Sequence, residues 1–335
     1  MNKLINIESR RYIGNKYKLK DWIMSLINRH CIGSSFADIF AGTGAISAEA
    51  VKYFEHVVVN DLLHSNYICY QAFFGSGVYN QNKITEILYT YNHLNPSNIC
   101  DNYFSINFSG KYFSHRTSKL IGYIREDIEN KKQKLTSKEY YILLASLIYS
   151  LDRIANTVGH YDAYIKKGIL EDNFVINQIK PYHIKKVDIF RQDANTLVNS
   201  LKSDIVYIDP PYNSRQYGRF YHILENVAKW DKPQLYGVAL KPETENASKY
   251  CTAKAPTALA ELVNNLKCKY IVVSYNNTYK SKSSSSKNKI SLEQIKEILE
   301  SRGTTSLMRK QYRFFNSGKT DFPDHKEYLF ITKVS

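Results

Sequence analysis

The chain has 335 residues, of which 43% are hydrophobic and 23% are charged, so wholesale disorder is excluded. At about 150 residues per domain, this length predicts roughly two domains. The formal net charge of +15 at pH 7 favours a polyanionic partner, most simply nucleic acid, although a general bias toward basic residues would give the same number. The five cysteines form no CxxC pair, so neither a structural zinc site nor a disulfide framework is expected.

The expected location follows from the first residues and from the longest apolar run. Residues 1–11 carry charges but no apolar core, so no signal peptide is expected. Residues 140–151 form the longest apolar run, which is too short to cross a bilayer. We therefore expect a cytoplasmic protein that has no membrane contact and no metal site.

The first part of the chain has the pattern of a βαβ unit. A helix is predicted first, because five apolar residues fall on one helical face: Leu19, Trp22, Ile23, Leu26 and Ile27. Residues 36–40 form a strand candidate that runs into a glycine turn. Residues 45–54 have a helical pattern, and residues 56–60 are a β-branched run that predicts a second strand.

The middle of the chain lacks this alternation of strands and helices. Two apolar helical faces, in residues 120–128 and 140–151, are surrounded by interleaved basic and aromatic side chains. The α/β pattern returns with strands predicted at 187–190, 204–208, 270–275 and 328–332, and a helix opened by a capping box from Ser291 to Gln294. The pattern predicts an α/β domain of residues 1–65 and 187–335, with an inserted, mostly helical domain of residues 66–186.

The sharpest motif is Asp209-Pro210-Pro211-Tyr212, directly after a predicted strand. Two prolines stop the hydrogen-bonding ladder and stiffen the backbone. Asp209 and Tyr212 are then expected at the carboxyl ends of the strands, where open α/β sheets bind ligands. A rigid turn without further function is the alternative.

A glycine turn is the second motif, in the segment Phe40-Ala41-Gly42-Thr43-Gly44. Glycines at this position let a ligand approach the backbone closely. An acidic residue that holds ribose hydroxyls is expected about 20 residues later, and Asp61 stands at the end of the next strand. The complete dinucleotide-binding fingerprint is absent, because Ser47 stands where its third glycine would be.

Together these segments resemble the adenine-N6 DNA methyltransferases of the D12 class, to which the Dam methylases belong. The N-terminal segment Tyr12-Ile13-Gly14-Asn15-Lys16 is similar to the family's cofactor segment, usually Trp-x-Gly-Gly-Lys, with Tyr12 and Asn15 as departures. Asn60-Asp61 resembles the ribose-binding step, and the segment around Asp193 resembles the step that contacts the cofactor adenine. The order of the motifs also matches.

The resemblance implies an α/β, Rossmann-like methyltransferase sheet that binds S-adenosyl-L-methionine. The cofactor-binding residues it implies are Tyr12, Lys16, Phe40, Gly42, Gly44, Asp61, Asp193 and Asp209. The catalytic residues it implies are Asp209, Pro210 and Tyr212. The Asp209 carboxylate and the Pro210 carbonyl would accept the two N6 hydrogens of adenine, Tyr212 would stack on the extruded base, and Tyr12 would meet the sulfonium by a cation–π contact.

The expected substrate is a short recognition sequence in double-stranded DNA, read mainly by the inserted domain as a target-recognition domain. A restriction–modification role would add a cognate endonuclease that acts separately. The candidate DNA-binding residues are Lys111, Arg116, Lys119, Arg153, Asn156, Arg215, Gln216 and Arg219. Structural roles for Arg153 and Asn156 and an ordinary loop at 213–219 stay open. The alternative functions are cytosine-N4 or RNA amino methylation, and a non-catalytic nucleic-acid-binding module.

Overall fold

The computed structural model describes residues 4–182, 186–243, 245, 247–277, 287–311 and 325–335. The chain divides into two compact units. The first comprises residues 1–13, 63–183 and 218–245, and the second comprises residues 14–62, 184–217 and 246–335. The predicted boundaries at 65/66 and 186/187 stay a prediction. The first unit also includes residues 1–13 and 218–245, which the hydrophobic patterns of the sequence did not group with the helical insert.

The second unit is built on a seven-stranded sheet of order β3-β2-β1-β4-β5-β7-β6. Strands β1 to β5 are parallel, while β7 pairs antiparallel with both β5 and β6. The strands are β1 (Ser35–Asp38), β2 (His56–Asn60), β3 (Val187–Phe190), β4 (Ile205–Ile208), β5 (Tyr270–Asn276), β6 (Gly303–Gln311) and β7 (Lys326–Val334). This is the predicted Rossmann-like α/β sheet, and six of its seven strands were predicted.

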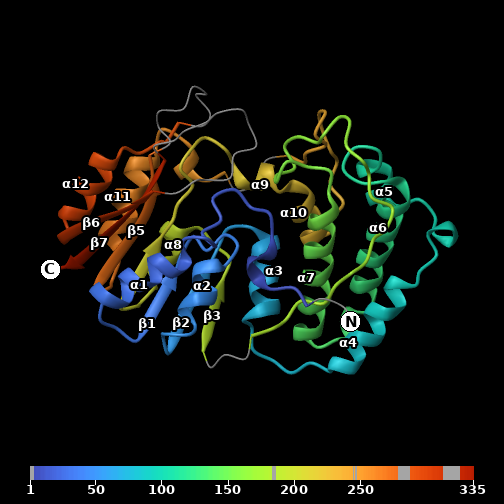
Figure 1. Cartoon of the computed structure of the whole chain (residues 1–335), viewed down its shortest axis with the longest axis horizontal. Coiled ribbons are helices and arrows are strands. Elements are labelled where there is room, and N and C mark those ends of the chain that lie inside the picture. The colour runs from blue at the N-terminus through green and yellow to red at the C-terminus, as the bar shows by residue number, and fades with distance from the viewer. Residues whose placement is uncertain (1–3, 183–185, 244, 246, 278–286, 312–324) are drawn as a thin grey trace. The chain divides into compact units, whose positions relative to one another are not determined.

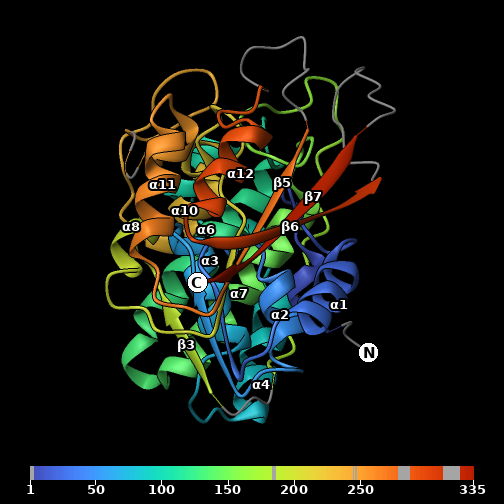
Figure 2. The ribbon, with the colours of Figure 1, turned by 90° about the vertical axis from the view of Figure 1, so that its left-hand side faces the viewer.

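Helices cover both faces of this sheet, as Figure 2 shows. On one face, α8 (Ala194–Leu197), α11 (Ala255–Asn265) and α12 (Leu292–Glu300) bury Leu197, Leu259 and Ile295 against the apolar strands. The predicted capping box of Ser291 and Gln294 opens α12. On the other face lie α1 (Lys20–His30) and α2 (Ala45–Ala50). The parallel strands β1, β2, β4 and β5 are therefore largely buried, which explains their mostly apolar sequences, whereas the edge strand β3 is partly exposed.

The strand order reverses between β1 and β4. From β1 the chain builds outward to β2 and β3, and from β4 it builds outward to β5. The register pairs Asp38 with Tyr207, so the carboxyl ends of the two central strands lie next to each other. Loops diverge at such a reversal and leave a crevice, which is where open α/β sheets bind ligands.

The first unit is helical in the described part, as Figure 1 shows for the helices labelled α3 to α7 and α10. Its helices are α3 (His64–Phe73), α4 (Gln81–Asn92), α5 (Tyr103–Phe108), α6 (His115–Asn130), α7 (Ser137–Ile154) and α10 (His222–Lys229), while the short α9 (Tyr217–Phe220) bridges the boundary. Helix α7 is buried nearly all round and packs against α3, α4, α6 and α10. The apolar face predicted for 140–151 is thus the centre of this unit. No helix among the described residues is long and apolar enough to cross a membrane.

Candidate active site

The loop after β1 turns on two glycines. Gly42 has a φ of 55° and Gly44 a φ of 77°, values that other residues rarely adopt. Gly44 is the N-cap residue of α2. Phe40 anchors the start of the loop, because its ring meets the ring of Tyr250 edge to face with centroids 5.0 Å apart. The predicted glycine turn therefore presents backbone at the carboxyl edge of the sheet.

Asp61 lies beside this turn. Its Oδ2 accepts a hydrogen bond from the Gly42 N–H at 2.9 Å. The preceding Asn60 ties neighbouring strand ends together. Its side-chain amide donates to the carbonyls of Ile39 and Gln192, each at 3.0 Å, and its Oδ1 accepts from the Gln192 N–H at 3.1 Å. The sequence spacing that singled out Asp61 thus corresponds to a direct contact with the glycine turn.

A buried carboxyl group that the motifs did not identify ends β1. The Asp38 side chain is inaccessible to solvent, and its Oδ2 accepts from the Ser47 hydroxyl at 2.7 Å. Its Oδ1 is buried without a hydrogen-bond partner among the described residues. Burial raises the pKa of Asp38 to about 7, and the charges of Asp209 and Asp61 act in the same direction. The available signal was a carboxylate in an apolar strand just before the glycine turn.

Asp193 follows β3 and caps α8. Its carboxylate accepts hydrogen bonds from the backbone N–H groups of Asn195 at 3.0 Å and Thr196 at 3.3 Å. This is the usual behaviour of an N-cap aspartate. Its role toward a cofactor stays a prediction.

Asp209 follows β4 and lies against a buried ammonium group. The Lys16 Nζ is 2.9 Å from Asp209 Oδ2 and donates a hydrogen bond to the Tyr212 hydroxyl at 2.8 Å. The Tyr212 hydroxyl in turn donates to Asp209 Oδ1. Burial raises the pKa of Asp209, while the Lys16 charge opposes that shift. Three of the predicted residues, Lys16, Asp209 and Tyr212, therefore form one hydrogen-bonded group.

Glu327 completes this group and was not predicted. It lies on β7 and is almost fully buried. Its Oε1 accepts from the Ser274 hydroxyl at 2.7 Å and lies 3.2 Å from the Tyr212 hydroxyl and 3.4 Å from the Lys16 Nζ. Burial raises the pKa of Glu327, with the ammonium of Lys16 opposing. A glutamate inside an apolar strand was the one sequence signal available.

The ring of Tyr212 also has close neighbours, one aromatic ring and one ammonium group, in addition to the hydrogen bonds of its hydroxyl. It lies 4.5 Å from the ring of Tyr275, centroid to centroid, at an interplanar angle of 56°. The Lys16 Nζ lies 5.0 Å from the Tyr212 ring centroid, within the range of a cation–π contact. The backbone carbonyl of Tyr212 accepts from the Lys289 N–H at 2.8 Å. Stacking of this ring on a substrate base stays a prediction.

Tyr12 belongs to the first unit. Its ring stacks on that of Tyr221, with centroids 4.6 Å apart and an interplanar angle of 6°. The guanidinium of Arg10 lies 5.8 Å from the centroid of the Tyr12 ring. A cation already lies near this ring, and its contact with a sulfonium stays a prediction.

Two of the candidate DNA-binding side chains form hydrogen bonds with backbone groups of the protein. The Asn156 amide donates to the carbonyls of Lys111 at 2.8 Å and Ile165 at 2.9 Å, so both of its hydrogens are used inside the first unit. The Gln216 amide makes two hydrogen bonds with the backbone of Ser248 in the second unit, at 2.9 and 3.2 Å. These contacts compete with any base reading by the same amides.

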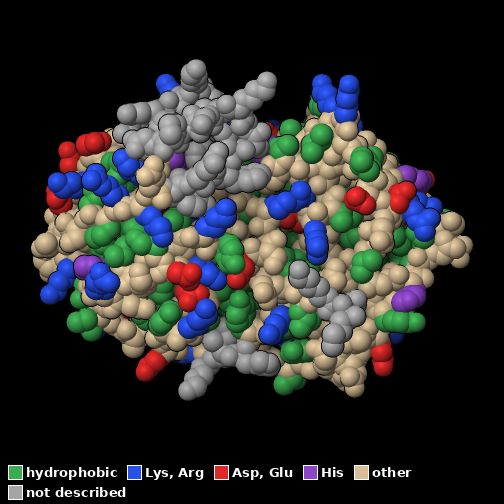
Figure 3. Space-filling model, viewed as in Figure 1, with side chains coloured by type: hydrophobic (Ala, Val, Ile, Leu, Met, Phe, Trp, Pro, Cys, Tyr) green, Lys and Arg blue, Asp and Glu red, His purple; other side chains and the backbone are tan. Residues whose placement is uncertain are grey.

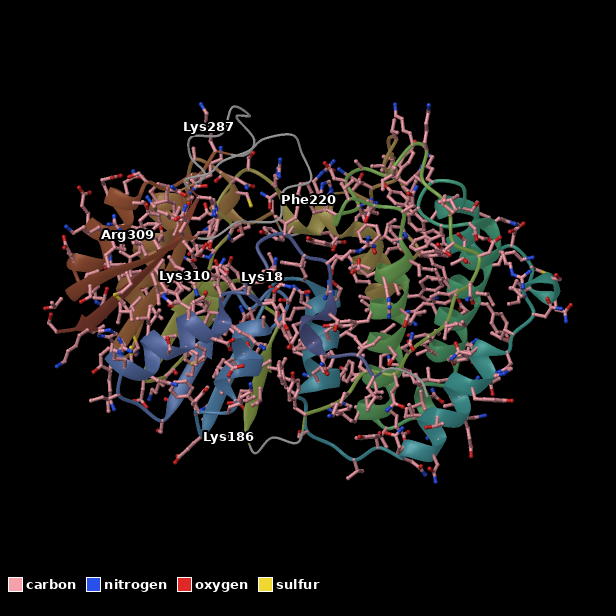
Figure 4. The ribbon with its side chains drawn as sticks, viewed as in Figure 1. Lys18, Lys186, Phe220, Lys287, Arg309 and Lys310 are labelled. Carbon is pink, nitrogen blue, oxygen red and sulfur yellow. The ribbon has the colours of Figure 1, made fainter. Side chains whose placement is uncertain are left out.

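The remaining candidates are cations that differ in their exposure. Arg116, Arg153 and Arg219 are exposed, whereas Lys111, Lys119 and Arg215 are half-buried. The second unit adds exposed cations that the motifs did not single out, namely Lys18, Lys287, Arg309 and Lys310, labelled in Figure 4. Figure 3 shows Lys and Arg side chains in several separate groups on the face in view.

A Rossmann-like sheet that carries a glycine turn after β1 and a partly buried Asp-Pro-Pro-Tyr segment after β4 defines an enzyme of the amino-methyltransferase class. Comparison with known proteins narrows this class. Residues 12–314 match the D12 class N6 adenine-specific DNA methyltransferases. The chain belongs to this family, and it is a DNA methyltransferase that uses a methyl donor.

Several curated proteins are similar to the chain over most of its length. Type II methyltransferase M.NlaIII of Neisseria lactamica is 31% identical, over 96% of this chain and 98% of that protein. Type II methyltransferase M.CviAII of Paramecium bursaria Chlorella virus 1 is 29% identical, over 96% of this chain and 98% of its own length. Modification methylase StsI of Streptococcus sanguinis is 36% identical over 80% of this chain, which corresponds to 44% of that longer protein.

Proposed function

We propose that the chain transfers a methyl group from S-adenosyl-L-methionine to adenine N6 in a short recognition sequence of double-stranded DNA. One observation carries the proposal. The Asp209 carboxylate follows the central strand β4 and lies in a buried hydrogen-bonded group with Lys16 and Tyr212. The proposed chemistry needs a carboxylate fixed at this edge of the sheet.

The chemistry follows from the low nucleophilicity of the adenine amino group, whose lone pair is delocalised into the ring. The Asp209 carboxylate and the Pro210 carbonyl would accept its two hydrogens. Accepting both favours a pyramidal nitrogen whose lone pair points at the methyl donor. Fixed acceptors of this kind act by electrostatic preorganisation, often the largest contribution to catalysis. Tyr212 would support the extruded base.

The residues around the glycine turn fit S-adenosyl-L-methionine. Asp61 would hold the ribose hydroxyls, and Gly42 and Gly44 would let the ligand approach the backbone. The buried Oδ1 of Asp38, without a partner among the described residues, fits a site that receives a polar or cationic group. When bound, the cofactor supplies an electrophilic methyl group on a sulfonium. Asp193 toward the adenine and Phe40 beside the turn complete the proposed set, together with Tyr12.

DNA is the proposed partner, and the net charge of +15 suits its phosphates. The exposed cations Arg116, Arg153 and Arg219 support phosphate or base contacts. Relatives named type II methyltransferases support a modification role beside a separately acting endonuclease. Access to cellular DNA would place the enzyme in the cytoplasm.

The test combines labelled S-adenosyl-L-methionine with DNA or RNA and identifies the modified nucleoside by mass spectrometry. We expect N6-methyladenine in DNA and, from sequencing of the modified bases, one short sequence context. The Asp209→Ala variant should lose transfer by a factor of at least about 100, because no other carboxylate takes its place. N4-methylcytosine, modified RNA or an active, folded Asp209→Ala protein would each overturn the proposal.

A further inference from the structure

The buried group around Asp209 holds two carboxylates but, among the described side chains that contact it, one ammonium. The Lys16 Nζ is 2.9 Å from Asp209 Oδ2 and 3.4 Å from Glu327 Oε1. The side-chain exposures are 6% for Lys16, 15% for Asp209 and 3% for Glu327, so water screens these charges weakly. The formal charges leave one negative charge in excess, and the ammonium has two alternative acceptors that differ by half an ångström in distance.

The arrangement creates a conflict for catalysis. Asp209 already receives the ammonium on Oδ2 and the Tyr212 hydroxyl on Oδ1. An adenine amino group that approaches the same carboxylate meets the ammonium at one of its oxygens. An acceptor shared with a cation is also a weaker partner for a neutral amine. The Lys16 ammonium therefore has to move away from the Asp209 carboxylate when the substrate binds.

Glu327 is placed to accept the hydrogen bonds that Lys16 and Tyr212 would otherwise donate to Asp209. Its Oε1 is the point where Lys16, Tyr212 and Ser274 converge. The Tyr212 hydroxyl has one hydrogen and two carboxylate acceptors, so it too can turn from Asp209 to Glu327. A buried carboxylate without donors is unfavourable, and the donors around Glu327 offset that cost.

We propose that Glu327 is a positioning residue that takes over the Lys16 ammonium when the amino group of the target base binds Asp209. Lys16 would move by the small distance that separates its two acceptors, while the ion pair stays buried. Glu327 touches neither the base nor the methyl donor in this scheme and acts through Lys16. The inference rests on the proposed function, because it assumes that Asp209 accepts the target amine.

The first test measures single-turnover methyl transfer at saturating DNA and donor. Glu327→Gln keeps the size of the side chain but removes the charge, so Lys16 should stay on Asp209 and transfer should slow by about ten-fold or more. Glu300→Gln on α12 is the matched control, because it makes the same change at an exposed glutamate outside this group. We expect it to change the rate by less than about three-fold.

A double-mutant cycle separates positioning from mere structural support. If Glu327 acts through Lys16, the Glu327→Gln change should alter the rate little in the Lys16→Met background. The Lys16→Met/Glu327→Gln protein should therefore match Lys16→Met alone within about three-fold. The double variant also keeps the formal charge of the wild-type group. Two effects that simply multiply would overturn the proposal.

A binding measurement gives a readout that does not depend on turnover. DNA with purine in place of the target adenine lacks the 6-amino group, so wild-type protein should prefer adenine. In Glu327→Gln, the logarithm of the affinity ratio for adenine DNA over purine DNA should fall by at least about half, because Lys16 competes for Asp209. An unchanged preference would contradict the proposal. If Glu327→Gln does not fold, Glu327→Met, which also removes the charge, replaces it, and a wild-type rate and preference in that variant would contradict the proposal in the same way.

The Asp209→Ala protein, assayed in parallel, separates the two possible failures. If Asp209→Ala keeps its activity, the proposed function of this site fails. If Asp209→Ala is inactive while Glu327→Gln behaves as wild type, the proposed function stands and the transfer of Lys16 to Glu327 alone is wrong.

Discussion

At the scale of single residues, three buried carboxyl groups stand at the carboxyl edge of the sheet. Burial raises the pKa of Asp38, Asp209 and Glu327, and one ammonium, that of Lys16, opposes the shift at two of them. Such an accumulation of negative charge opposes folding but attracts a cation. We therefore expect the site to bind a positively charged methyl donor more tightly than its neutral product.

Asp38 gives a pH-dependent prediction. Its pKa in the folded protein, about 7, lies above its ordinary value of 3.8. The stability it contributes is therefore full below pH 4 and is lost as the pH rises through 7. Asp38→Asn should raise the free energy of unfolding by on the order of 2–4 kcal/mol at pH 8 and by little at pH 4.5. Urea unfolding at both pH values measures this. An equal difference at both would show that ionisation of Asp38 is not the cause.

Asp61 gives a prediction about binding. Asp61→Ala should weaken the affinity for S-adenosyl-L-methionine by about 1.5–3 kcal/mol, because it removes hydrogen bonds from a charged acceptor to the ribose. Affinity for DNA should change little. Isothermal calorimetry with the cofactor alone is the measurement. Unchanged cofactor affinity would exclude Asp61 from the site.

At the scale of elements, the C-terminal end of helix α7 depends on one arginine. The Arg11 guanidinium donates to the carbonyls of Asp152 and, at 3.0 Å, Ala155, which end this helix. The Arg11 N–H also donates to the Asp152 carboxylate at 3.2 Å, and that carboxylate accepts from the Tyr161 hydroxyl at 2.8 Å. The first residues of the chain thus satisfy carbonyls that a helix end leaves without intrahelical partners.

Arg11→Met should lower the free energy of unfolding by about 1–3 kcal/mol, because these carbonyls lose a charged donor. Arg153 is the matched control, since it is exposed on the last turn of the same helix. Arg153→Met should change stability by less than about 0.5 kcal/mol. Urea denaturation of both variants checks this. Equal destabilisation by both variants would show that the contacts of Arg11 with the end of α7 are not the cause of the effect.

The elements also show how far the sequence predicts the fold. The glycine turn, the proline pair and the capping box at Ser291 were predictable, because each depends on residues adjacent in the chain. Strand β6 was missed, because it is an edge strand of mostly exposed Thr, Ser and Lys residues without apolar alternation. Glu327 was missed because its partners come from β5, from the loop after β4 and from the N-terminal segment. Only the tertiary fold brings these together.

At the scale of the whole molecule, the segments that make up the first unit decide how DNA sequence specificity can be transferred from a relative. Residues 218–245 belong with 63–183. Within that unit, the Arg125 Nε donates to the Val227 carbonyl at 2.6 Å, and the Trp230 Nε1 donates to the Glu126 carboxylate at 2.8 Å. An exchange of residues 66–186 alone would break such contacts.

A hybrid that takes residues 63–183 and 218–245 together from a relative should therefore fold and methylate the donor's sequence. The hybrid with residues 66–186 alone should show a lower midpoint of urea unfolding, because buried charged contacts lose partners. Sequencing of modified bases reports the specificity of each hybrid. Methylation of the original sequence by an active double-segment hybrid would move sequence reading to the second unit.

The antiparallel strand β7 has a consequence for the time at which activity appears. It delivers Glu327 to Lys16, so the group joins residues from opposite ends of the chain. A ribosome makes about 5–20 residues per second, so tens of seconds pass between the synthesis of the two partners. During that interval the newly made N-terminal segment has no β7 to complete the sheet. A chain whose translation stops before residue 326 lacks Glu327 and cannot build the group, so we expect modification of DNA to begin only after β7 has been made.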